Sequence, residues 1–90
     1  PADFTYPGPI PFTKEQTILM LADSLEASSK SLKNPDAKDI DDLVERIIDT
    51  KIKDGQLIDS PLTFSELGKC KEVFKSRLKS MNHVRIEYPT

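Results

Sequence analysis

The chain of 90 residues contains few residues of several types, and each shortage excludes a class of structure or function. Its single cysteine, Cys70, excludes a disulfide within the chain and suits a reducing compartment, although it could still pair between chains. One histidine is too few for a metal site built from several imidazoles. No apolar run approaches the ~20 residues of a membrane span, so we expect no direct membrane contact. The formal net charge of -2 lacks the basic excess typical of proteins that bind nucleic-acid polymers.

The length and composition favour one small, thin-cored globular unit. Ninety residues make one domain at most. Hydrophobic residues at 37% and charged residues at 31% are usual for a globular protein. The sequence begins at Pro1, and the proline-rich opening reads as the middle of a protein rather than as a signal peptide. We therefore expect residues 1–90 to be a piece of something larger.

Helix start signals divide the chain into three helical segments. Thr13 and Thr63 are each followed three residues later by a side chain, Gln16 or Glu66, that can complete a capping box. Asp36 can cap a first turn that carries further negative charge. The predicted helices cover about residues 13–32, 36–54 and 63–81.

Helix stop signals and the two ends complete the predicted fold. Asn34 precedes a proline and therefore resists the helical conformation, while Gly55 can supply the left-handed position that closes a helix. Four prolines in residues 1–12 predict an extended strip, and alternating apolar residues in 84–89 predict an extended tail. The predicted fold class is all-α, a small three-helix arrangement with an extended Pro-rich N-terminal strip and an extended C-terminal tail.

Apolar stripes mark the faces that the second and third helices bury. The second stripe consists of Ile40, Leu43, Val44, Ile47, Ile48 and Ile52. The third consists of Leu67, Cys70, Phe74, Leu78 and Met81, with Lys71, Lys75 and Lys79 along its flank. We expect Cys70 to be a small core residue and His83 a surface or packing residue. The lysine flank is more simply a solvated face than a phosphate site.

The first helix carries the residue of greatest chemical interest. Its first half is apolar nearly all round, and a helical projection places Asp23 between Leu19 and Ala27. That position predicts a carboxylate entering an interior, where it needs a cation, a metal or hydrogen-bond donors. The alternative is that Asp23 lies at a half-exposed edge or pairs with Lys30.

An ordered series of motifs resembles a known family over essentially the whole chain. The motifs are FTYPGPIP from Phe4, TKEQ from Thr13, ILMLADSLEA from Ile18, KSL from Lys30, DGQL from Asp54, LT from Leu62 and RIEYP from Arg85. In this order they resemble the last part of the HD domain of the membrane-anchored seven-helix HD phosphohydrolases. The resemblance implies that residues 1–90 are the C-terminal portion of an HD hydrolase domain and a fragment of its all-α fold.

The same resemblance implies a function for the parent protein. It would be a bacterial membrane protein whose HD domain, on the cytoplasmic side of the inner membrane, hydrolyses cyclic di-AMP with manganese or iron. Asp23 would be the final aspartate ligand of that metal. Tyr6 and Lys30, which replaces an expected arginine, are weaker candidates for substrate binding. Tyr6 could equally anchor a rigid turn, and an ordinary helix pair with Glu26 is the simpler role for Lys30.

The histidines and the His-Asp pair of that family are absent, since His83 is the only histidine. Upstream helices of the same protein would supply them, so we expect this segment alone to be inactive, to bind no metal and to associate with itself through exposed core surface. The alternative function is a self-standing three-helix interaction module whose partner surface is the stripe from Ile40 to Ile52. A hydrolase segment should leave Asp23 beside an exposed apolar groove, whereas a complete module should cover that helix.

Overall fold

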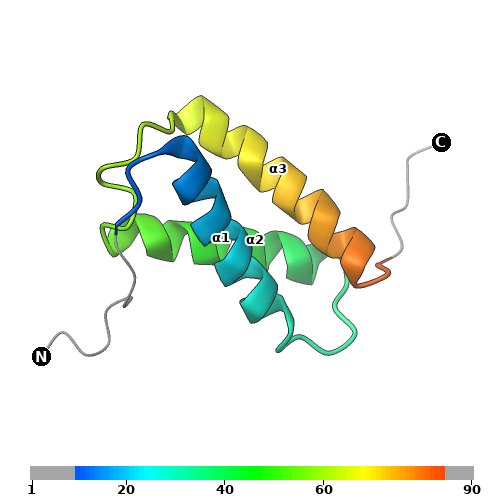
Figure 1. Cartoon of the computed structure of the whole chain (residues 1–90). Helices are drawn as coiled ribbons and strands as arrows, with labels where there is room; N and C mark the ends of the chain where they lie inside the picture. The colour runs from blue at the N-terminus through cyan, green and yellow to red at the C-terminus, as the bar shows by residue number, and fades with distance from the viewer. Residues whose placement is uncertain (1–9, 85–90) are drawn as a thin grey trace, which may run out of the picture.

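The computed structural model describes residues 10–84, so the predictions for the strip before residue 10 and for the tail beyond residue 84 lie outside the described residues. Within that range the fold consists of three helices, α1 (Lys14–Ser29), α2 (Ala37–Lys53) and α3 (Phe64–Met81), and contains no strand. Each helix contacts the other two. In the view of Figure 1, α1 crosses in front of α2, and α3 slants from the top of the view down to the right. The all-α prediction is confirmed.

The start of α1 is capped and tied to the α2–α3 connector. Thr13 Oγ1 accepts a hydrogen bond from the Gln16 backbone N–H at 3.0 Å, as predicted. Gln16 Oε1, however, accepts from the Phe12 N–H at 3.0 Å, so only half of the predicted capping box forms. The fully buried Thr17 hydroxyl donates to the Thr13 carbonyl at 2.9 Å and lies 2.6 Å from Ser60 Oγ in the connector. These bonds fix α1 against the turn that leads into α3.

The end of α1 differs from the prediction, because the helix stops at Ser29 rather than near residue 32. Ser29 Oγ donates to the Glu26 carbonyl at 2.9 Å, and Ser31 Oγ donates to the Ser28 carbonyl at 2.7 Å. Serine hydroxyls that bond to nearby carbonyls compete with the helical ladder. Asn34 then takes a left-handed φ of 47°. Local serine chemistry thus ends the helix before the proline signal is reached.

The starts of α2 and α3 match their sequence signals. Asp36 and Asp39 form a reciprocal capping box at α2, with bonds of 2.8 and 3.1 Å. Thr63 and Glu66 do the same at α3, with both bonds at 3.0 Å. At the other end of α2, Gly55 takes the predicted left-handed conformation with φ of 76°. The capping side chains therefore define these boundaries.

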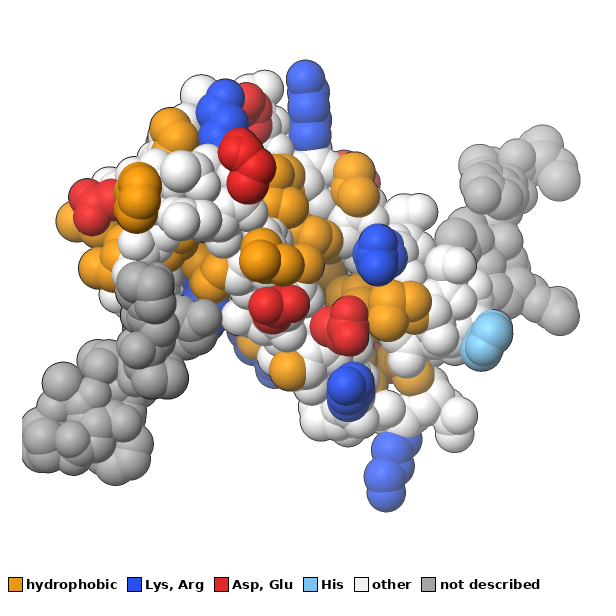
Figure 2. Space-filling view, viewed as in Figure 1, with side chains coloured by type: hydrophobic (Ala, Val, Ile, Leu, Met, Phe, Trp, Pro, Cys, Tyr) orange, Lys and Arg blue, Asp and Glu red, His pale blue; other side chains and the backbone are white. Residues whose placement is uncertain are grey.

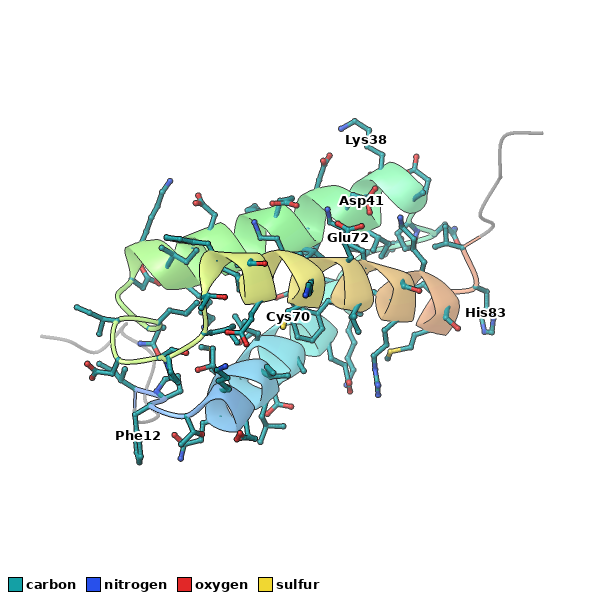
Figure 3. All side chains as sticks on the ribbon, turned by 90° about the horizontal axis from the view of Figure 1, so that it is seen from above. Phe12, Lys38, Asp41, Cys70, Glu72 and His83 are labelled. Atoms are coloured by element: carbon teal, nitrogen blue, oxygen red, sulfur yellow. The ribbon has the colours of Figure 1, made fainter. Side chains whose placement is uncertain are left out.

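One core joins the three helices. Its buried residues are Met20, Leu21 and Leu25 of α1, Ile40, Val44 and Ile48 of α2, and Leu67, Phe74 and Leu78 of α3. Cys70 packs against this core from α3, as predicted (Figure 3). Most of the α2 stripe is therefore buried inside the chain rather than available to a partner. Among the described residues, no helix combines the length and the apolar character needed to cross a membrane.

The lysine flank of α3 is not simply solvated, which corrects the prediction. Lys71 and Lys75 lie 2.9 and 2.8 Å from the two carboxylate oxygens of Glu45 on α2. Lys79 lies 2.8 Å from Asp41 Oδ1, also on α2. Figure 3 shows these two helices side by side. The sequence pattern could not reveal these pairs because they join residues 26 to 38 positions apart.

Candidate functional site

Asp23 lies in the middle of α1 and is exposed in this structure. The expectation that its carboxylate enters an interior is wrong for the described residues. Neighbouring helix positions are rotated by about 100°, so Asp23 lies about 200° from Leu21, on the side of α1 opposite the buried Leu21 and Leu25. The core that these leucines enter holds the helix in place. Asp23 is therefore a fixed, accessible carboxylate.

The first of two concavities beside Asp23 lies at the N-terminal end of α1. We call it the N-terminal hollow; it has a volume of about 200 Å³ and is lined by Ile10, Pro11, Phe12, Gln16, Leu19, Met20 and Asp23. Leu19 is 62% exposed and Phe12 67% exposed. Asp23 is the single charged residue of this described lining, so the hollow offers an apolar surface with one carboxylate at its edge.

The second concavity runs between α1 and α3. We call it the α1–α3 groove; it has a volume of about 360 Å³ and is lined by Ile18, Leu19, Ala22, Asp23, Leu25, Glu26, Val73, Phe74, Arg77, Leu78 and Met81. Figure 2, which looks onto the α1 side of the molecule, shows hydrophobic side chains at the surface among charged ones. Asp23 belongs to both concavities. Residues 10–84 thus leave this side of α1 uncovered, which is the arrangement predicted for a segment completed by further protein.

Asp23 can supply one ligand to a metal but not a whole site. Residues 10–84 contain no group of three or more His, Cys, Asp or Glu side chains that could hold a metal ion. A single exposed carboxylate suits manganese or iron as one ligand among several, because these ions accept oxygen together with imidazole nitrogen. Asp23 could therefore be one ligand of a metal site whose other ligands come from further protein segments. Its metal role stays a prediction.

The structure does not bring the other predicted site residues to Asp23. Tyr6 lies outside the described residues. Lys30 is exposed at the C-cap of α1, about 10 Å along the helix from Asp23, and lines neither concavity. Among the residues that the structure describes, no ion pair joins Lys30 to Asp23 or to Glu26, so the simpler helix pair predicted for it does not form.

Arg77 is the residue that the sequence interpretation missed. It is exposed on α3 and lines the α1–α3 groove together with Asp23. A signal was present, because Val73, Arg77 and Met81 are spaced by four residues and so share one helix face. The spacing alone does not show which helix lies beside that face.

Two carboxyl groups with lowered pKa values lie away from Asp23 and hold the helices together. Lys14 Nζ lies 2.7 Å from Glu66 Oε2 and, with the Thr63 N–H, lowers the pKa of Glu66 to about 2. Hydrogen bonds from Lys75 and then Lys71 lower the pKa of Glu45. These are structural ion pairs between helices, so they do not mark a second reactive site.

Comparison with known proteins shows relatives much longer than this chain. It is 45% identical over 87 residues to the cyclic-di-AMP phosphodiesterase PgpH of Bacillus subtilis and 34% identical over 88 residues to that of Listeria monocytogenes. It is 40% identical over 87 residues to an uncharacterized protein of Synechocystis. These alignments cover 97 to 98% of the chain but only 11 to 12% of each relative. The chain is thus homologous along nearly its whole length to a small segment of such proteins. No family model and no solved structure matches it.

Proposed function

We propose that the chain is the C-terminal portion of the HD domain of a metal-dependent phosphodiesterase that hydrolyses cyclic di-AMP, and that Asp23 is one of the metal ligands. The observation that carries the proposal is the exposed Asp23 between two uncovered apolar concavities. Two of the relatives are named as phosphodiesterases of this cyclic dinucleotide. The parent would lie in a bacterial inner membrane with this segment on the cytoplasmic side.

The physical chemistry of Asp23 supports this role. An exposed carboxylate at the edge of an apolar hollow becomes partly desolvated once other helices cover the hollow, and a divalent cation then offsets the cost of its charge. A bound manganese or iron ion polarises a phosphoryl oxygen and lowers the pKa of a water molecule. The contribution of this chain is to hold the Asp23 carboxylate on a helix anchored by Leu21 and Leu25. The other ligands would come from upstream helices of the same protein.

The interaction-module alternative has less support. It required the stripe from Ile40 to Ile52 to be a partner surface, but Ile40, Val44 and Ile48 are each 0% exposed. Only Ile52, at 39%, is exposed among the large apolar residues of α2. The uncovered surface lies on α1 instead, beside the proposed ligand.

The test is hydrolysis of cyclic di-AMP by the full-length protein with added manganese, comparing wild type, Asp23→Asn and Glu15→Gln. Glu15 is an exposed carboxylate of α1 that lines neither concavity, so it is a matched control for loss of charge. We expect Asp23→Asn to lose activity about 100-fold or more and to retain less manganese, because one ligand is gone. Glu15→Gln should match wild type.

Retention of wild-type activity and metal content by Asp23→Asn would disprove the ligand assignment. The isolated 90-residue chain should show no hydrolysis at any manganese concentration, since its described part has no group of three or more His, Cys, Asp or Glu side chains that could hold a metal ion.

A further inference from the structure

We propose that Arg77 binds a phosphate of the substrate in the α1–α3 groove and that the apolar walls of this groove receive a nucleobase. The inference rests on the proposed function and adds to it a substrate-binding residue on α3. It follows from a difference in charge between the two concavities beside Asp23, from the unpaired state of Arg77, and from the size and walls of the groove.

The two concavities suit different occupants. The N-terminal hollow contains no cation among its described lining residues, so it suits apolar side chains from the rest of the protein. In the described lining of the α1–α3 groove, Arg77 is the single cation. Asp23 and Glu26 place two negative charges in the same groove, so an anion there is attracted by Arg77 and repelled by the two carboxylates. In the proposed parent, a metal held by Asp23 would offset this repulsion, and Arg77 would bind the phosphate.

Arg77 is free to make this contact. No described residue forms an ion pair or a hydrogen bond with its guanidinium. The three lysines of the α3 flank, in contrast, are held by Glu45 and Asp41 of α2. A guanidinium presents a planar fork of donors that matches two phosphate oxygens. The rigid α3 helix, with Phe74 and Leu78 in the core, fixes where that fork can reach.

The walls and the size of the groove suit a nucleobase. Its exposed apolar residues are Ile18 at 39%, Leu19 at 62%, Val73 at 63% and Met81 at 47%. A volume of about 360 Å³ falls within the ~300–1,000 Å³ of small-molecule pockets. Such walls can cover the faces of a flat purine, while its attached phosphate stays at the polar edge with Arg77 and Asp23.

The experiment measures kcat and KM for cyclic di-AMP with the manganese-loaded full-length protein, comparing wild type with Arg77→Ala, Arg77→Lys and Arg46→Ala. Arg46 is an exposed arginine of α2 outside both concavities, so it controls for loss of one positive charge. We expect Arg77→Ala to raise KM about 10- to 100-fold while kcat changes less than about threefold, because a charge-assisted contact to the substrate is lost. Arg77→Lys should recover part of the loss, and Arg46→Ala should match wild type.

The outcomes separate this inference from the proposed function. An active wild type with an unchanged KM in Arg77→Ala would overturn the role of Arg77 and leave the phosphodiesterase standing; a helix of the same protein would then be the occupant of the groove. A rise in KM accompanied by a lower melting temperature, with no recovery in Arg77→Lys, would make Arg77 structural and also overturn the inference. A wild type without activity on cyclic di-AMP would overturn both proposals.

Discussion

At the scale of single residues, backbone conformation decides how α2 and α3 end. Gly55 follows α2 with φ of 76°, and His83 follows α3 with φ of 55°. In each case the N–H of the next residue donates to a carbonyl in the last turns of the helix. The Gln56 N–H donates to the Lys51 carbonyl at 3.0 Å, and the Val84 N–H donates to the Lys79 carbonyl at 2.9 Å. This pairing satisfies carbonyls that the helix end leaves free. A residue with a Cβ strains this left-handed turn and glycine does not.

The glycines allow a matched prediction of opposite sign. Gly55→Ala should lower the free energy of unfolding by about 1 kcal/mol, because alanine is strained at a left-handed φ. Gly68 lies inside α3, so Gly68→Ala should raise it by about 0.5 to 1 kcal/mol. A Cβ meets nothing within 4 Å at either site, so packing does not confuse the comparison. Urea unfolding measures both values, and a shift of the same sign in the two variants would contradict the backbone argument.

At the scale of elements, ion pairs connect the helices at the edges of their shared apolar core. Lys14 of α1 bonds to Glu66 of α3, and Glu45 of α2 accepts from Lys71 and Lys75 of α3. The pairs are partly exposed, with side chains 16 to 49% accessible, so each adds modestly to stability. Their contribution depends on pH because the carboxylates must stay ionised.

The lowered pKa of Glu66 predicts a loss of stability in acid. This group has a pKa of about 2 in the folded chain, below the ordinary 4.5, so its contribution is fully present above 4.5 and is lost as pH falls through 2. Between pH 6 and pH 2, the melting temperature should therefore fall less for Glu66→Gln than for wild type. Glu26 forms no ion pair with another described residue. The melting temperature of Glu26→Gln should therefore fall as much as that of wild type. Equal declines in all three proteins would refute the role of Glu66.

At the scale of the whole molecule, three helices of this length cannot cover every apolar side chain. The described chain extends over 47 × 29 × 18 Å, and its core leaves Ile18, Leu19, Val73 and Met81 exposed along the α1–α3 groove. Small chains bury a limited share of their surface. An uncovered apolar surface of this kind marks an interface. In the proposed parent, upstream helices and substrate would cover it; in the isolated chain, a second copy can do so.

The isolated chain should therefore associate with itself through the side of α1 that carries Leu19. Leu19→Glu should lower the weight-average mass in sedimentation velocity toward that of the 10.1 kDa monomer, because it places a charge where both concavities meet. Phe64→Glu is the control, since Phe64 is 87% exposed but lines neither concavity. A monomeric wild type, or equal disruption by Phe64→Glu, would exclude this surface as the site of association.

The sequence alone determined the helix starts, the left-handed end of α2 and most of the buried stripes of α2 and α3, although Ile52 and Met81, the last residue of each predicted stripe, are exposed. These features depend on side chains within about four residues of one another, and such contacts repeat with the helical period. It also singled out Asp23 through its surroundings and predicted a metal role for it. The early end of α1 escaped prediction because serine hydroxyls outcompeted the later proline signal.

Only the tertiary structure decided which side of α1 is covered. The first half of that helix is apolar nearly all round, so its pattern did not decide which of its apolar side chains would face the core. Packing against α2 and α3 buried Leu21, left Asp23 exposed and brought Arg77 into the same groove. Contacts across more than fifty positions depend on how the helices cross, and helical periodicity contains no information on that crossing.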